Sequence, residues 1–209
     1  MTSFRIPVLL VMVSVASTGA HSQSLSSLRV GDTFSETRKL GAAPSSRRQA
    51  GPFLVQKWKL PDGNELSVAA NEHSGRIVYL ELTWGGEHAG ILTDFSGLIF
   101  GRTTLGELRH RFSGNGFTYE QRGSSLKVPD GFTLSTSYEV ADQPNTVVTF
   151  TTKVTDEGPA MDNPASQARL IGISIGQANY LDGLWGSVKV YDSAQSKIKM
   201  QSELRGIVE

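Results

Sequence analysis

Leu60-Pro61-Asp62-Gly63-Asn64-Glu65-Leu66-Ser67 is the stretch that decides the predicted fold, because it recurs as Val128-Pro129-Asp130-Gly131-Phe132-Thr133-Leu134-Ser135. In both copies Pro-Asp-Gly separates two apolar runs. Proline fixes φ, aspartate bonds to nearby backbone and glycine accepts a positive φ, so the tripeptide favours a turn. Each copy therefore predicts a β-hairpin.

Two further matches precede the hairpins in the same order. Val30-Gly31-Asp32-Thr33 is similar to Phe100-Gly101-Arg102-Thr103, and a Thr-x-x-Glu pattern follows at Thr33 and again at Thr104. Thr-x-x-Glu is a capping box, which begins a helix by satisfying free amides of its first turn. Three matches in one order predict an internal duplication.

Alternating apolar residues predict the strands of each copy. The first copy contains runs at 53–60, 66–71 and 76–84, and the second at 117–128, 132–140 and 146–154. In the run 76–84 the period of two places Val78, Leu80, Leu82 and Trp84 on one face and Ile77, Tyr79, Glu81 and Thr83 on the other. Each copy thus predicts one short helix followed by antiparallel strands.

We therefore predict an α+β fold of two tandem helix-plus-antiparallel-sheet repeats, with a C-terminal strand or hairpin extension. The expected units are a signal peptide at 1–22, repeat unit 1 at 23–90, repeat unit 2 at 91–178 and the extension at 179–209. The final hairpin is expected from 185–191 and 197–200.

The first residues have the pattern of an export signal. Arg5 precedes an apolar run over 6–16, and small residues follow up to Ala20. This order predicts a secretory signal peptide, and the run is shorter than the ~20 residues that a membrane span needs. Because the chain contains no cysteine, we expect neither disulfides nor a lipidated cysteine. A periplasmic location is expected, with secretion as the alternative.

Several motifs of the first copy resemble the SmpA/OmlA domain, known from a small lipoprotein of the outer-membrane barrel-assembly machine. They are Gly31-x-Thr33, Leu40-Gly41-x-x-Pro44, Trp58, the glycine hairpin and the strand over 77–82. Two such units in tandem are similar to the β-lactamase inhibitor protein family. The resemblance covers about residues 28–154 and implies an interaction role. The chain departs from both families in having no cysteine.

Composition and charge exclude several classes of protein. Twenty Lys and Arg balance 20 Asp and Glu, whereas nucleic-acid-binding proteins usually carry a basic field. The absence of cysteine excludes thiolate zinc sites, iron–sulfur clusters and cysteine nucleophiles. We expect no nucleic-acid partner and no transmembrane segment after signal cleavage.

Known catalytic and metal-binding patterns are weak. Gly172-Ile173-Ser174-Ile175-Gly176 matches the nucleophile elbow, but no histidine follows it, and the two isoleucines favour a continuous strand. Glu72-His73 and Glu87-His88 offer metal ligands, yet the strand between them would hold them about 30 Å apart. Asp62 and Asp130 are interpreted as turn formers. We therefore expect no catalytic residue, no metal and no cofactor.

A mixed aromatic and charged sheet face is the candidate binding surface. Tyr79 is expected opposite the core, with Lys57, Lys59 and Glu81 as neighbours. Glu139 and Lys153 are expected on the corresponding face of the second copy. Tyrosine beside both charge signs suits protein recognition, whereas an ordinary solvated face is the alternative.

These observations predict an exported, soluble, non-enzymatic protein-binding module, either an inhibitor or an envelope assembly factor. Its partner would be an unknown periplasmic or extracellular protein. A periplasmic small-ligand or lipid carrier is the alternative, because a curved sheet can enclose an apolar groove. An enzyme with a dispersed site is a third hypothesis.

Overall fold

The computed structural model describes residues 24–86, 95–155, 163–191 and 197–198. The N-terminal half contains β1 (Ser24–Leu25), β2 (Leu28–Arg29), the 3-10 helix η1 (Phe34–Leu40), β3 (Ser46–Ala50), β4 (Phe53–Lys59), β5 (Glu65–Asn71) and β6 (Arg76–Thr83). The C-terminal half contains α1 (Leu105–Arg111), β7 (Phe117–Tyr119), β8 (Ser125–Val128), β9 (Gly131–Val140), β10 (Gln143–Thr155), α2 (Pro164–Gln167), β11 (Arg169–Gln177), α3 (Ala178–Trp185), β12 (Lys189–Tyr191) and β13 (Lys197–Ile198). The predicted signal peptide, residues 1–22, lies outside these ranges, as does the boundary expected at residue 90.

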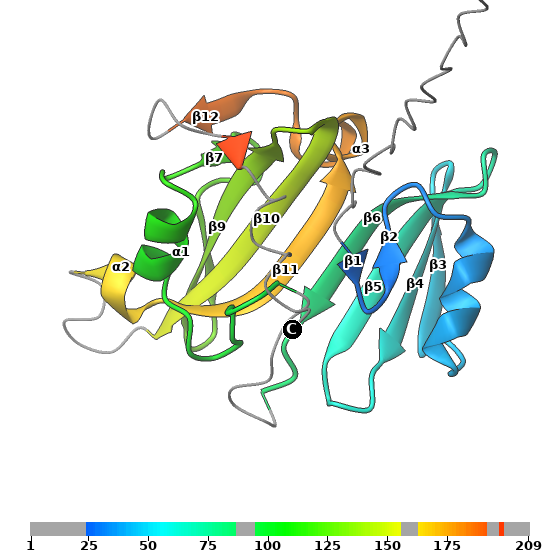
Figure 1. Ribbon diagram of the computed structural model, residues 1–209, viewed down its shortest axis with the longest axis horizontal. Coiled ribbons are helices and arrows are strands. Elements are labelled where there is room, and N and C mark those ends of the chain that lie inside the picture. Colours follow the sequence, from blue (N-terminus) through cyan, green and yellow to red (C-terminus); the bar gives the residue numbers. More distant parts are fainter. Residues whose placement is uncertain (1–23, 87–94, 156–162, 192–196, 199–209) are drawn as a thin grey trace, which may run out of the picture.

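A single large sheet runs through both halves of the chain (Figure 1). Its strand order is β12-β7-β9-β10-β11-β6-β5-β4-β3, and β8 and β13 also pair with β9. The halves join where β11 pairs with β6 in antiparallel register, with Ile173 opposite Leu82 and Ile175 opposite Leu80. Backbone hydrogen bonds therefore cross from one half to the other without interruption.

The predicted fold class, two tandem helix-plus-antiparallel-sheet repeats, is wrong. The structure is mostly one antiparallel sheet, and its helices are few and short. In the N-terminal half, the β1–β2 hairpin covers the sheet with the fully buried Leu25 and Leu28, in the place expected for a helix. Just after this hairpin, the amide of Gly31 donates to the Ile77 carbonyl of β6, and the amide of Phe34 donates to the Gly75 carbonyl in the turn before β6.

The two capping boxes have different outcomes. Before α1, the amide of Glu107 donates to Oγ1 of Thr104 at 3.1 Å, and the amide of Thr104 donates to the Glu107 carboxylate at 2.6 Å. That capping box is confirmed. The box expected at Thr33 is wrong, since the Thr33 hydroxyl is hydrogen bonded to the Ser35 hydroxyl and caps no amide.

Both Pro-Asp-Gly hairpins are confirmed, and the C-terminal hairpin is wrong. β4 pairs with β5, and β8 pairs with β9, each around the predicted turn. In the first turn the amide of Asn64 donates to the Asp62 carboxylate at 3.0 Å, which confirms Asp62 as a turn former. Near the C-terminus, Trp185 instead ends α3, β12 pairs with β7, and β13 lies parallel to β9.

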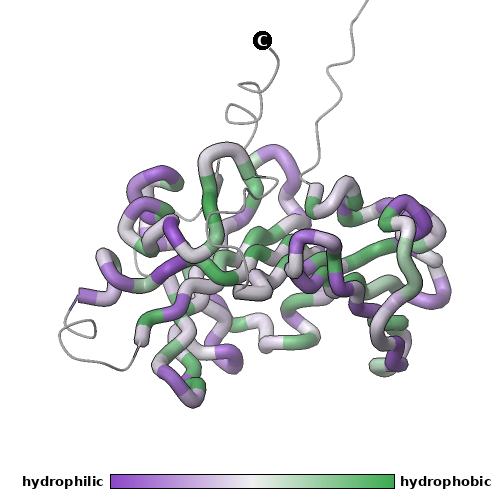
Figure 2. The backbone as a smooth tube through the Cα atoms, turned by 90° about the horizontal axis from the view of Figure 1, so that it is seen from below, coloured by the Kyte–Doolittle hydropathy of each residue, from purple (hydrophilic) through white to green (hydrophobic). Residues whose placement is uncertain are grey.

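The sheet has apolar clusters on both faces. Figure 2 shows hydrophobic and hydrophilic stretches alternating along the chain, with hydrophilic stretches frequent at the outer bends. The main core lies under the β1–β2 hairpin and α1 and includes Leu25, Leu28, Trp58, Leu66, Val68, Ile77, Leu80, Phe100, Leu108, Phe112, Tyr138, Phe150 and Ile173. The second cluster, on the other face, contains Val55, Ala69, Val78, Tyr79, Phe117, Tyr119, Val147 and Leu181.

A β-bulge in β6 changes which residues face each cluster. The register with β5 shifts between Ala69 and Ala70, because Val78 is an extra residue with no partner opposite. Ile77 consequently packs in the main core, while Val78 and Tyr79 both pack in the second cluster. The predicted alternation is confirmed for Tyr79 and wrong for Ile77 and Val78.

Candidate functional site

Two neighbouring rows of residues cross the sheet on the face of the second cluster. The first row follows the strand pairing through Arg48, Val55, Ala69, Tyr79, Gly176 and Val147. The second row follows it through Lys57, Ser67, Glu81, Ser174 and Thr149. An aromatic and apolar row therefore lies beside a polar and charged row, and both span the junction between the halves.

Helix α3 covers part of the first row. Gly176 leaves room for it, because a Cβ atom there would lie 3.0 Å from both Leu181 and the Tyr79 ring. From α3, Tyr180 approaches Tyr79 with ring centroids 5.6 Å apart, and Trp185 meets the same ring edge-on at 6.3 Å. The sheet face, which was predicted to be open, is therefore partly covered by α3.

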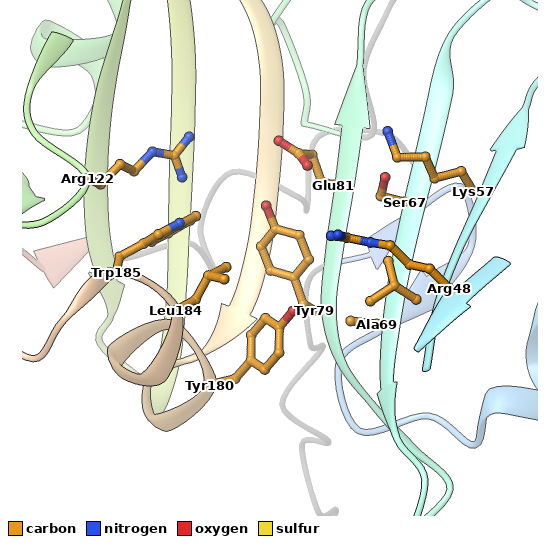
Figure 3. A pocket seen from close by; sticks show the side chains of 11 residues that line it. Arg48, Lys57, Ser67, Ala69, Tyr79, Glu81, Arg122, Tyr180, Leu184 and Trp185 are labelled. Carbon is orange, nitrogen blue, oxygen red and sulfur yellow. The ribbon is translucent and has the colours of Figure 1, made fainter. Parts of the chain in front are cut away.

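An open groove of about 320 Å³ remains between α3 and the strands of the N-terminal half (Figure 3). We call it the Tyr79 groove. Its lining comprises Arg48, Val55, Lys57, Ser67, Ala69, Tyr79, Glu81, Arg122, Tyr180, Leu184 and Trp185. Tyr79 is buried at its centre, whereas Leu184 at the rim is 51% exposed.

The cations of the groove differ in their surroundings. Arg122 follows β7 and stacks on Trp185, with the guanidinium carbon 3.9 Å from the ring centroid. Its Nη1 atom is buried and has no hydrogen-bond partner within the described part of the chain. Lys57 is different, because its ammonium forms an ion pair with Glu65 at 2.6 Å.

Arg48 and Arg122 approach the Tyr79 ring from opposite sides, and the Glu81 carboxylate lies between them (Figure 3). Among the residues that the structure describes, these three groups form no ion pair within 4.0 Å. The two guanidinium groups and one carboxylate give the centre of the groove an excess of positive charge.

The environment of the groove raises the pKa values of its tyrosines. Burial is the main cause for Tyr79, and the Glu81 carboxylate adds to it, while a hydrogen bond with Ser174 and the Arg122 charge act in the opposite direction. Burial also raises the pKa of Tyr180, and the nearby Arg48 charge opposes this. Both phenols therefore stay neutral hydrogen-bonding groups at ordinary pH.

Three of the six predicted site residues meet in the groove. Lys57, Tyr79 and Glu81 line it. The other three lie elsewhere on the sheet. Glu139 forms an ion pair with Lys189 at 3.0 Å, and Lys153 forms one with Asp130 at 2.5 Å. Lys59, the last residue of β4, is opposite Glu65 and does not line the groove.

Five residues that enclose the groove were not predicted from the sequence, namely Arg48, Arg122, Tyr180, Leu184 and Trp185. Arg48 belongs to the pair Arg47-Arg48, which matches no binding motif, and Arg122 precedes a glycine–serine segment. Tyr180, Leu184 and Trp185 belong to α3, a helix that was not predicted. Their spacing along the chain is helical, and this was the available signal.

Other candidate chemistry has a structural explanation where the chain is described. Gly172-Ile173-Ser174-Ile175-Gly176 forms a continuous part of β11, as the sequence indicates, and Ser174 is buried there. Glu87 and His88 lie outside the described residues. Within those residues there is no group of three His, Cys, Asp or Glu side chains placed to hold a metal. In the described part of the chain, no helix is long and apolar enough to cross a membrane.

A second cavity of about 520 Å³ lies beside α1, lined by residues that include Arg102, Glu107 and Arg111. It contains none of the six predicted residues, and its described lining includes no phenylalanine, tyrosine or tryptophan. The Tyr79 groove combines predicted residues, aromatic rings and a buried guanidinium nitrogen that has no hydrogen-bond partner in the described part of the chain, so it is the stronger candidate.

Comparison with protein-family models, curated proteins and solved structures gave no match, and the resemblance to SmpA/OmlA domains stays a prediction from sequence motifs.

Proposed function

We propose that this protein is a non-catalytic binding module that recognises another protein through the Tyr79 groove. The observation that carries the proposal is the meeting of three aromatic rings and two arginines in one open groove, where neither arginine forms an ion pair with any residue that the structure describes. Tyrosine, tryptophan and arginine contribute most of the binding energy at protein interfaces, particularly where they are packed and shielded from water.

The size and lining of the groove favour a protein segment over a lipid. A volume of about 320 Å³ receives a few side chains and is at the lower end of the range for small-molecule pockets. Ser67 and Glu81 line it together with Arg48 and Arg122, and an acyl chain would offer these polar groups no hydrogen-bond partner. The exposed Leu184 offers a partner an apolar contact at the rim.

The test is affinity capture with two matched variants. The C-terminally tagged chain is incubated with a cell-envelope extract of its own source, and retained proteins and small molecules are identified by mass spectrometry. Leu184→Asp places a charge at the groove, whereas Leu126→Asp places the same charge on β8, where Leu126 is 65% exposed. Both changes affect exposed leucines, so their effects on folding should be similar.

The proposal expects a stoichiometric protein partner that Leu184→Asp releases and Leu126→Asp retains. Equal capture by both variants would show that binding occurs elsewhere on the surface. Retention of a small molecule or lipid without any protein would overturn the proposal in favour of a carrier.

Export to the periplasm is part of the proposal. It rests on the order of Arg5, the apolar run at 6–16 and the small residues that follow. Cell fractionation and N-terminal sequencing of the purified protein test it directly. The expected mature chain begins near residue 23, and an intact N-terminus in the cytoplasm would contradict export.

A further inference from the structure

We infer that the Tyr79 groove binds a carboxylate of the partner protein between Arg122 and Arg48, with an apolar group of the same segment against Tyr180 and Leu184. This inference rests on the proposed function and adds the chemical class that the groove recognises. The carboxylate would come from an aspartate or glutamate side chain or from a chain terminus.

Arg122 is the first support, because part of its charge is buried without a partner. Stacking on Trp185 at 3.9 Å satisfies the face of the guanidinium and leaves its N–H groups free to donate. The buried Nη1 atom has no acceptor in the described part of the chain. A desolvated donor of this kind is costly unless an acceptor arrives, and a carboxylate matches the planar guanidinium best.

Arg48 is the second support. It comes from β3, the strand at the edge of the sheet, and its side chain extends toward the Tyr79 ring (Figure 3). Its charge is close enough to affect the pKa of Tyr180. The guanidinium groups of Arg48 and Arg122 therefore both line the Tyr79 groove, although they come from segments that are far apart in the sequence.

Glu81 allows binding of an anion to be distinguished from binding of a cation. It is the single anionic residue among those that line the groove, and it lies between the two arginines. A bound carboxylate would be repelled by Glu81, so its replacement by glutamine should strengthen binding of an anion. A groove built for a cation, held by aromatic rings and Glu81, would respond in the opposite direction.

The experiment uses N-acetyl-phenylalanine as the probe, because it places a carboxylate beside an apolar ring. N-acetyl-phenylalaninamide has the same ring and no charge, and it is the matched control ligand. Binding is followed at millimolar concentrations by the NMR signal of the Trp185 indole, identified with Trp185→Phe. The same titration is run on Arg122→Gln, Arg122→Lys, Arg48→Gln and Glu81→Gln. Arg47→Gln is the control variant, since Arg47 precedes Arg48 on β3 and does not line the groove.

We expect the acid to bind and the amide to bind at least roughly tenfold more weakly, since a charge-assisted hydrogen bond contributes about that much. Arg122→Gln should weaken the acid by a similar factor and Arg48→Gln by less, because Arg48 is exposed. Arg122→Lys should restore part of the loss. Glu81→Gln should tighten binding, and Arg47→Gln should leave it unchanged.

Equal binding of acid and amide, or weaker acid binding by Glu81→Gln, would overturn the carboxylate inference. So would a complete absence of acid binding to the correctly folded wild-type chain. If capture of a protein partner were still lost in Leu184→Asp, the proposed function would stand while the carboxylate inference failed. Thermal unfolding of each variant checks that a loss of binding is not a loss of folding.

Discussion

The hydroxyl groups of Ser137 on β9 and Thr149 on β10 lie 2.8 Å apart and are hydrogen bonded inside the sheet. Ser137 is 1% exposed and Thr149 is fully buried, so water cannot replace either partner. They lie opposite each other in the strand register, and Thr149 belongs to the polar row that also contains Glu81. The pair therefore continues the polar row beyond the groove into the C-terminal half.

This pair predicts a strong non-additivity of stability. Thr149→Val keeps the shape of the side chain but leaves the Ser137 hydroxyl buried without this partner, which should cost about 1–3 kcal/mol of unfolding free energy. Adding Ser137→Ala removes the unpaired group, so the double variant should recover most of that loss. Urea denaturation of the four proteins measures the coupling. Additive losses would show that the two hydroxyls do not depend on each other.

The close approach of α3 to β11 predicts that a larger residue at Gly176 destabilises the protein. A Cβ atom at Gly176 would lie 3.0 Å from Leu181 and from Tyr79, so Gly176→Ala should cost about 1–3 kcal/mol by overpacking. Gly172→Ala is the control on the same strand, because its nearest contact would be an ordinary 3.5 Å from Thr151. Chemical denaturation should give Gly176→Ala a clearly lower unfolding free energy than Gly172→Ala. Equal unfolding free energies would show that α3 does not pack closely against the sheet at Gly176.

The two Thr-x-x-Glu segments should respond differently to the same substitution. Thr104→Ala removes the hydroxyl that accepts from the Glu107 amide and should cost about 1 kcal/mol of unfolding free energy. Thr33→Ala removes a hydroxyl that caps no amide and should have a much smaller effect. Thermal unfolding compares the two, and equal losses would contradict the difference between the helix starts.

The Glu107 carboxylate should make stability depend on pH. Hydrogen bonds from the backbone and side chain of Thr104 lower its pKa from the ordinary 4.5. Because the folded pKa is the lower one, the stabilisation is present above pH 4.5 and is lost as the pH falls through the folded value.

Glu107→Gln cannot titrate and provides the reference. The difference in stability between wild type and Glu107→Gln should therefore shrink below pH 4.5 and be constant above it. Denaturation across the acidic range gives this difference directly. In a Thr104→Ala background the pH-dependent part should shrink but persist, since the hydroxyl donor is lost while the backbone amide of residue 104, the larger of the two causes that lower the pKa, is retained.

The elements that the sequence predicts well depend on local chemistry. Pro61-Asp62-Gly63 forms its turn from contacts within a few residues, and the Thr104 capping box closes over four positions. The pairing of β6 with β11 was not predicted, because both strands are apolar enough to be central and nothing nearby in sequence specifies the partner. Helix α3 was missed because it is only eight residues long and contains Asp182 and Gly183.

The candidate site divides in the same way. Tyr79, Lys57 and Glu81 could be placed together because β4 and β6 both pair with β5 in one half, where alternation and hairpin order suffice. Arg122 and Trp185 come from the other half, and their meeting depends on the junction and on α3. The bulge at Val78 also escaped the analysis, since an extra residue in a strand leaves no mark on an apolar run.

The junction of β6 with β11 also limits the order in which the chain can fold. Many residues, including all of β7, β8, β9 and β10, separate these two strands along the sequence. Contacts between such distant segments form slowly, because the intervening chain must first be ordered. Until β11 arrives, β6 presents an unpaired apolar edge that other chains can join. A chain cut short before Arg169 should therefore aggregate even when its hairpins have formed. In the full-length chain, the edge of β6 is covered only when β11 pairs with it, which is late in folding.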